Sequence, residues 1–297
     1  MPQLAHLRQK IRSVQKTKKI THAMRLISMS FYNKLEKRRP VLDAYVGRLE
    51  STFEYLLTHS KEWINPILAP DDLLDQKPLY IIVSTTKGWC GSLNTNLFRY
   101  IEQVLFLEEN QAASFIIIGT KAISYFKMNA LIKKYQNARL VAVYPEVASS
   151  NLFALADELI ERALFGPQRY STVSFFVNEA RSFFAQKAVR KTVLPVSHNS
   201  KVRPFKDRQD AGTEDVLWEQ PVQEILDFVA GRYLRGRIIQ LLFNAMRAEH
   251  SARFLAMESA TKNAEKIIDK LTRQFNKMRQ AMITKEISEL SAGAVQR

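Results

Sequence analysis

The sequence has one cysteine, Cys90, and no long apolar run. A single cysteine excludes a disulfide within the chain and is typical of a protein in a reducing compartment. The longest apolar runs are short, such as LYIIV at 79–83 and FIIIG at 115–119, whereas a membrane-spanning helix needs about 18–20 residues. The first residues also lack the apolar segment of a signal peptide. We therefore expect a soluble intracellular protein.

Proline and glycine are absent between Arg237 and Ala292. A helix of this length extends roughly 80 Å, which exceeds the width of a compact domain. Small and apolar residues recur there at intervals of three and four, the period of a helix with a buried stripe. Two overlapping stripes occupy different faces. The first comprises Leu234, Ile238, Leu241, Ala245, Ala248, Ala252 and Leu255, and the second comprises Phe254, Met257, Thr261, Ala264, Ile268, Leu271, Phe275, Met278 and Met282.

The N-terminal segment, roughly 3–58, has the same periodicity. Its apolar residues follow spacings of three and four, so we predict a helix that forms a coiled coil with the C-terminal helix. Pro40 predicts a kink or a short break. The predicted stripe comprises Leu4, Leu7, Ile11 and Val14, then Ile20, Met24, Ile27 and Phe31.

Acidic residues are scarce near the N-terminus. Between Arg8 and Arg39 there are eleven Lys or Arg residues and one acid, Glu36, in a chain of formal net charge +15. Such a segment favours an acidic partner. Nucleic acid, anionic lipid and an acidic protein surface all satisfy this condition, and the charge pattern does not choose between them.

The spacing of apolar residues changes in the middle of the chain. Short apolar runs alternate with helical stretches, which predicts a small α/β domain with a largely parallel sheet between the two terminal helices. The predicted strands are 79–85, 115–119, 138–144, 171–180 and 188–196. The predicted division is an N-terminal helix over 1–60, a connector over 61–77, the α/β domain over 78–200, a connector over 201–213 and a C-terminal helix over 214–297.

No pattern of catalytic or metal-binding residues is evident. TTKGWCGSLNTNL at 85–97 follows a strand and precedes a helix, but it lacks the full glycine pattern of a nucleotide loop, which favours a tight turn over phosphate binding. Cys90 has no neighbouring histidine, so we interpret it as a buried apolar residue. The five histidines have no metal-ligand spacing. We expect neither cofactor, nor metal, nor catalytic residue.

Four blocks give the chain a specific resemblance. They are RQKIRSVQKTKKITHAMRLIS at 8–28, VSTTKGWCGSLNTNL at 83–97, EHSARFLAMESATKNA at 249–264 and NKMRQAMITKEISELSAGA at 276–294. In this order they resemble the gamma-subunit family of F-type ATP synthases. That resemblance covers almost the whole chain and implies a Rossmann-like α/β domain inserted into a long antiparallel two-helix coiled coil.

The resemblance also implies function and partners. Members of the family are rotor stalks that carry torque between the c-ring and the catalytic alpha and beta subunits, one copy per complex, with an epsilon subunit at the foot. For a bacterial-type member it implies a peripheral position at the cytoplasmic face of the inner membrane. By position in the family motifs, the implied alpha/beta contacts are Lys18, Lys19, Met24, Arg279, Gln280 and Thr284. The implied c-ring or epsilon contacts are Trp218, Glu219 and Tyr233.

This chain departs from the family pattern at two places. Thr86 and Trp89 stand in the turn where relatives usually carry an acid and a leucine. Arg235, Gly236 and Arg237 follow the RY pair, where relatives often carry an acid. Two alternatives to the rotor stalk are a basic coiled-coil protein that binds nucleic acid and a small nucleotide-binding α/β enzyme.

Overall fold

The computed structural model describes residues 2–59, 77–107, 113–129, 138–166, 168, 170–195 and 221–295. These residues divide into two compact units. The first unit lies within Met1–Phe31, Trp89–Gly91 and His250–Arg297, and the second lies within Tyr32–Gly88 and Ser92–Glu249.

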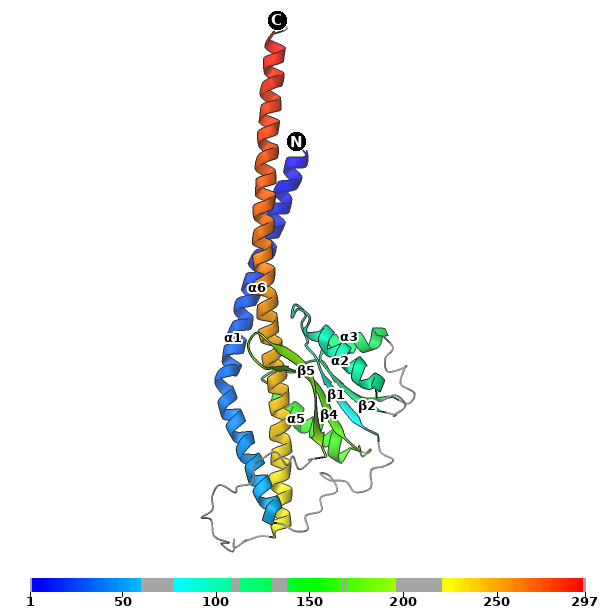
Figure 1. Ribbon diagram of the computed structural model, residues 1–297. Helices are drawn as coiled ribbons and strands as arrows, with labels where there is room; N and C mark the ends of the chain where they lie inside the picture. Colours follow the sequence, from blue (N-terminus) through cyan, green and yellow to red (C-terminus); the bar gives the residue numbers. More distant parts are fainter. Residues whose placement is uncertain are drawn as a thin grey trace. The chain divides into compact units, whose positions relative to one another are not determined.

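Two long helices contribute to both units. Helix α1 spans Pro2–His59 and helix α6 spans Val222–Val295, as Figure 1 shows. The predicted terminal helices are therefore confirmed. Of the kink or short break predicted at Pro40, the break is wrong, since α1 continues through this residue. Pro40 is exposed, so water can solvate the carbonyl group that loses its helical hydrogen bond. Neither these helices nor the shorter ones in the described ranges combine the length and apolar character that crossing a bilayer requires.

The second unit contains a five-stranded sheet in the order β3-β2-β1-β4-β5. Strands β1 (Leu79–Val83), β2 (Ser114–Ile118), β3 (Arg139–Tyr144) and β4 (Val173–Ala180) are parallel, and β5 (Gln186–Leu194) returns antiparallel to β4. The prediction of a largely parallel sheet is confirmed. Every residue of β1 and β2 is buried, which explains their uninterrupted apolar sequences, because a central parallel strand is covered on both faces.

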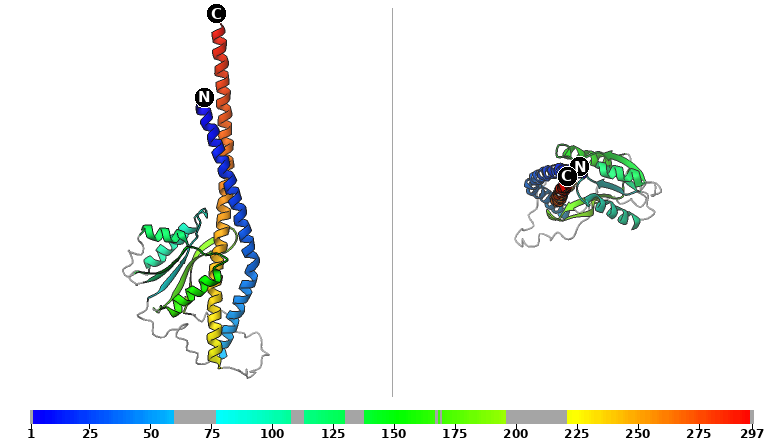
Figure 2. Two further views of the ribbon diagram at one scale, coloured as in Figure 1. Left: turned by 180° about the vertical axis from the view of Figure 1, so that it is seen from behind. Right: turned by 90° about the horizontal axis from the view of Figure 1, so that it is seen from above.

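Helices cover both faces of the sheet. Alternate residues of β1, such as Tyr80 and Ile82, pack with α2 (Leu93–Leu107) and α3 (Thr120–Asn129). The intervening residues, such as Ile81, pack with α5 (Leu152–Ile160) and with the parts of α1 and α6 that belong to this unit. Figures 1 and 2 show α2 and α3 together on one face and α5 on the other. Within the second unit, the sheet is thus joined to the helical pair by a continuous apolar core.

Substitution of two glycines tests the backbone geometry of this unit. Gly119, which follows β2, has a φ of 98°, and a Cβ atom there would lie 2.4 Å from the carbonyl oxygen of Ser84. Gly47 lies within α1, and a Cβ atom added there would have nothing within 4 Å. We expect Gly119→Ala to lower the free energy of unfolding by about 1–3 kcal/mol. We expect Gly47→Ala to raise it by about 0.5–1 kcal/mol.

Urea unfolding of the two variants and the wild-type chain measures both effects. Equal unfolding free energies for the two variants would contradict the assigned backbone geometry at Gly119.

Candidate functional site

Charged pairs join α1 to α6 in the first unit. Lys18 Nζ lies 2.9 Å from Glu265 Oε1, and Arg25 forms an ion pair with Glu258. Seven residues forward in α1 correspond to seven residues back in α6, which is the register of an antiparallel coiled coil. The second unit has the same register in three pairs, which are Glu36 with Arg247, Asp43 with Gln240, and Glu50 with Tyr233.

Between its ion pairs, the seam of the first unit consists largely of small side chains. The hydroxyl oxygens of Thr21 and Thr261 lie 2.9 Å apart. Each also lies within hydrogen-bond distance of a carbonyl oxygen one turn earlier in its own helix, that of Lys18 at 3.0 Å and that of Met257 at 2.7 Å. The backbones can therefore approach without unpaired hydroxyl groups. Further buried residues of this seam are Ser28, Ser251, Ala252 and Ala264.

The small polar seam leaves larger apolar side chains outside. Ile20, Ile27 and Phe31 are 59%, 56% and 47% exposed. They are seven and four residues apart and so share one face of α1, which we call the α1 stripe. The sequence predicted these three residues as buried. That prediction is wrong for Ile20 and Ile27, because Thr21 and Ser28 occupy the contact with α6. Phe31 is about half exposed and contacts α6 through its stacking on His250. Met24 is half-buried at the border between the two faces.

The burial predicted for the other residues of the apolar stripes is confirmed. Leu4, Leu7, Ile11 and Val14 are half-buried, and the predicted residues of α6 from Leu234 to Met282 are buried or half-buried. Since Lys18 pairs with Glu265, the register places Pro2 opposite residue 281. Helix α6 continues to Val295. Its last described turns therefore extend beyond the start of α1, and Ile283 and Ile287 are 46% and 61% exposed there.

His250 is the principal titratable group of the first unit with a strongly altered pKa. Its ring stacks on Phe31, with centroids 5.1 Å apart. Burial, together with the charge of Arg253, lowers the pKa of His250 to about 4. The imidazole is consequently neutral at physiological pH and acts as an aromatic surface.

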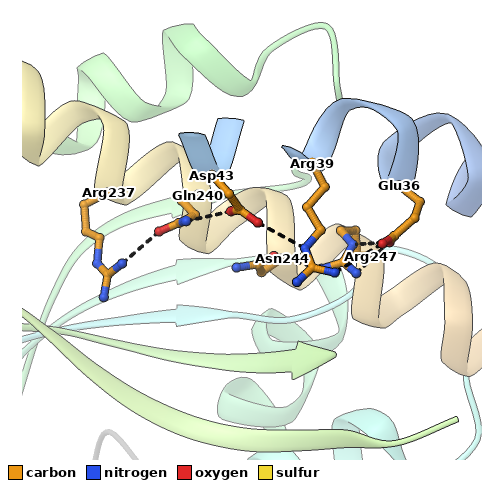
Figure 3. A network of polar contacts seen from close by, with 7 residues as sticks. All are labelled: Glu36, Arg39, Asp43, Arg237, Gln240, Asn244 and Arg247. Carbon is orange, nitrogen blue, oxygen red and sulfur yellow. Dashed lines mark hydrogen bonds and ion pairs between the residues drawn. The ribbon is translucent and has the colours of Figure 1, made fainter. Parts of the chain in front are cut away.

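A network of polar side chains links the two helices in the second unit (Figure 3). Arg247, whose side chain is 4% exposed, donates from Nε and Nη2 to Glu36 Oε2 at 3.0 and 2.6 Å. Arg39 joins Glu36 to Asp43 within α1, at 3.2 and 3.1 Å. Gln240 donates to Asp43 and accepts from Arg237, both at 2.8 Å. The network gives the buried guanidinium group of Arg247 a carboxylate partner.

The network changes the pKa values of Glu36 and Arg39. Burial alone would raise the pKa of Glu36, but the hydrogen bonds and charge of Arg247, with a contribution from Arg39, lower it below the ordinary 4.5. The hydrogen bond to Glu36 raises the pKa of Arg39. Glu36 therefore stays ionised over the physiological range. It is the lone acid in the basic N-terminal segment, and that isolation is the sequence signal for its role.

The structure places the residues implied as alpha/beta contacts in the first unit. Lys18 is engaged by Glu265 across the seam, and both side chains remain about half exposed. Lys19 is exposed and carries no such pair within the described residues. Arg279, Gln280 and Thr284 are exposed near the end of α6, where Thr284 donates to the carbonyl oxygen of Gln280 at 3.0 Å. Their contacts with other subunits stay predictions.

The residues implied as c-ring or epsilon contacts are only partly described. Tyr233 is half-buried, stacks on Phe53 with centroids 5.7 Å apart, and donates to Glu50 at 3.4 Å. Burial and the nearby charge of Glu50 raise its pKa. Trp218 and Glu219 lie outside the described residues.

The basic run after Tyr233 has structural roles that the sequence did not reveal. Arg235 donates from Nε and Nη2 to the two carboxylate oxygens of Asp157 at 2.5 and 2.6 Å, which ties α6 to α5. A Cβ atom at Gly236 would lie 3.3 Å from the Val46 side chain, so the glycine permits close approach of α1 and α6. Pairs so distant in sequence leave no local pattern.

The turn after β1 is closed by its own hydrogen bonds. The Thr85 amide donates to Asn94 Oδ1 at 3.3 Å, and Asn94 Nδ2 donates to Thr85 Oγ1 at 2.7 Å. These contacts agree with the predicted tight turn. Cys90 is buried, as predicted, and Trp89 is 62% exposed at a φ of 66°. The described residues contain no group of three or more His, Cys, Asp or Glu side chains that could hold a metal ion.

Comparisons with known proteins identify the architecture. The family model described as ATP synthase matches residues 3–295. The ATP synthase gamma chains of Pelotomaculum thermopropionicum and Glaesserella parasuis are each 30% identical, with 99% and 97% of this chain and the same shares of those proteins covered. A chain from the Euglena gracilis mitochondrial ATP synthase structure "OSCP/F1/c-ring, rotational state 3" has the same fold, with a TM-score of 0.69 at 18% identity, covering 99% of this chain and 94% of that one.

The Glu36–Arg247 pair predicts that replacing Glu36 and replacing Arg247 lower the free energy of unfolding by different amounts. Glu36→Gln leaves a buried guanidinium group without a carboxylate, and we expect it to lower the free energy of unfolding by about 2 kcal/mol, a value reduced for the partial exposure of Glu36. Arg247→Met leaves a carboxylate that water can reach, so we expect it to lower the free energy of unfolding by less. Urea unfolding of both variants and of the double variant measures this difference. An equal or larger loss in Arg247→Met would contradict it.

His250 predicts a pH dependence of stability. Its folded pKa, about 4, lies below the ordinary 6.5, so between these values the unfolded chain binds a proton that the folded chain does not. The contribution of neutral His250 is complete above pH 6.5 and is lost as the pH falls toward 4, by roughly 2–3 kcal/mol. Unfolding free energies measured between about pH 7.5 and 4.5 should decrease less in His250→Gln than in wild type. Parallel pH profiles would refute the assignment.

Proposed function

This chain belongs to the ATP synthase gamma-chain family, which forms the central stalk of F-type ATP synthases, and we propose that it transmits torque within that complex. Torque passes between a membrane ring of c subunits, turned by ion flow, and the catalytic head of alpha and beta subunits. The chain itself carries no active site in this proposal. Catalysis belongs to the beta subunits, whose conformations change in turn as the stalk rotates.

The observation that carries this proposal is the α1 stripe. Ile20, Ile27 and Phe31 form an apolar face that stays about half exposed, although Phe31 also stacks on His250 of α6. The stripe lies in a basic segment with Lys19 beside it. An apolar face with few directional bonds can slide past successive partners, whereas a face of specific polar contacts would hold one position. These are suitable properties for a shaft within a ring of subunits.

The end of α6 supports the same function. Beyond the start of α1 it has no partner helix in the described residues, yet Ile283 and Ile287 form an exposed apolar pair four residues apart. Arg279, Gln280 and Thr284 add hydrogen-bonding groups near this end. We propose that alpha and beta subunits cover this segment, and that Lys18, Lys19 and Met24 meet them from α1.

The opposite ends of the two helices would meet the membrane ring. Tyr233, with Trp218 and Glu219, is proposed to contact the c-ring and the epsilon subunit, as their positions in the family motifs imply. One copy of the chain per complex would lie at the cytoplasmic face of a bacterial inner membrane, held there by the complex. The proteins of known structure and sequence named above give no support to the nucleic-acid-binding alternative.

Arg279 and Gln280 provide a test of torque coupling. Arginine and glutamine make directional hydrogen bonds, so we propose that they favour particular angles of the stalk against beta. A hydrogen bond to a charged group contributes roughly 1.5–3 kcal/mol. The double change Arg279→Ala with Gln280→Ala should therefore lower the ATP hydrolysis rate of the assembled enzyme about tenfold, while the amount assembled changes little.

Lys266→Ala with Lys270→Ala is the matched control, since both residues are exposed on the same helix and outside its seam. Specific activity and the yield of purified complex are measured together for both pairs. If the control pair reduces specific activity equally, the coupling role of Arg279 and Gln280 is wrong.

A further inference from the structure

A polar cavity of about 250 Å³ lies in the second unit, beside the network of Figure 3. Helix α1, strands β4 and β5, and helix α6 all contribute to its wall. The charged and amide residues of the wall are Arg39, Asp43, Glu179, Lys191, Arg237, Gln240, Asn244 and Arg247.

Positive charge exceeds negative charge around the cavity. Its wall has four basic and two acidic side chains. Both acids already have basic partners, since Asp43 accepts from Arg39 at 3.1 Å and Glu179 lies 3.7 Å from Lys191. Glu36, behind the wall, is shared by Arg39 and Arg247. Among the described residues, Arg237 pairs with the amide of Gln240 and with no carboxylate.

Hydrogen-bond donors also remain available. The almost fully buried guanidinium group of Arg247 has five N–H groups. It donates two of them to Glu36 and one to Asn244. Arg237 is half-buried and donates one N–H group to Gln240. In Figure 3 the Arg237 guanidinium is directed from α6 toward the strands. A buried cation with unused donors is costly unless an anion or water supplies acceptors.

We propose that this cavity binds a small oxyanion of the inorganic phosphate type, with Arg237 as its principal ligand and Lys191 and Arg247 completing the site. Planar guanidinium groups match the oxygens of phosphate in two-point contacts. The cavity is smaller than the roughly 300–1,000 Å³ of typical small-molecule pockets. It therefore accommodates phosphate with its waters better than a nucleotide.

Binding would connect two parts of the second unit. Arg237 and Arg247 belong to α6 and Lys191 belongs to β5, so one anion would bridge α6 and the sheet. A ligand that binds only the folded chain stabilises it by RT ln(1 + L/Kd), where L is the ligand concentration, so the stabilisation grows with that concentration. The joint between the sheet and α6 would thus become stiffer as the phosphate concentration rises.

Calorimetric titration of the full chain with inorganic phosphate tests the site, with chloride at matched ionic strength as the reference. We expect saturable binding of about one phosphate per chain to the wild type, at least tenfold weaker binding to Arg237→Gln, and weaker binding to Lys191→Gln. Arg232→Gln is the control, because Arg232 is exposed, lies over the Phe228 ring and does not line the cavity. Its affinity should stay within twofold of wild type. Thermal unfolding in chloride confirms that each variant is folded.

Three results of the phosphate titration would overturn the proposal. They are no saturable phosphate binding to the folded wild-type chain, an unchanged affinity in Arg237→Gln, and an equal loss of affinity in Arg232→Gln. A glutamate-rich peptide that binds more tightly than phosphate, with the same dependence on Arg237, would reassign the cavity to an acidic segment of a partner protein and overturn it as well.

Discussion

The antiparallel pairing of α1 with α6 is the constraint on which the other features depend. It fixes which residue of one helix meets which residue of the other, with Lys18 opposite Glu265 in the first unit and Glu36 opposite Arg247 in the second. Within this register the small residues of the first unit let the helices approach closely. The larger apolar residues of α1 are then left outside, where a partner protein can cover them.

The two units use different kinds of side chain to pair α1 with α6. The first uses hydroxyl groups, alanines and partly exposed ion pairs, which bury little apolar surface. In the second, large apolar residues of α6 such as Leu242 join the core beneath the sheet, and a buried arginine is neutralised by Glu36. Apolar burial is the larger source of stability. The second unit is thus suited to anchor the helical pair, and the first to present a surface to other subunits.

The elements could be predicted from the sequence because their patterns are local. Runs such as LYIIV identified the strands, and spacings of three and four identified the helices. The orientation of Ile20, Ile27 and Phe31 could not be predicted by assuming that apolar residues lie inside, because Thr21 and Ser28 bond to carbonyl groups of their own helix and can therefore be buried. The pairs Glu36–Arg247 and Asp157–Arg235 were missed because they join residues 211 and 78 positions apart.

The central claim is that partner subunits cover the α1 stripe, and cysteine labelling tests it most directly. Ile20→Cys, Ile27→Cys and Phe31→Cys are made singly in a Cys90→Ser chain, with Val41→Cys as a control that is exposed on the same helix. Maleimide reaction rates are compared in the free chain and in its complex with alpha and beta subunits. The account predicts fast reaction at all four positions in the free chain and at least tenfold slower reaction at the three stripe positions in the complex, with Val41→Cys unchanged. Equal rates at the stripe positions in both forms would contradict it.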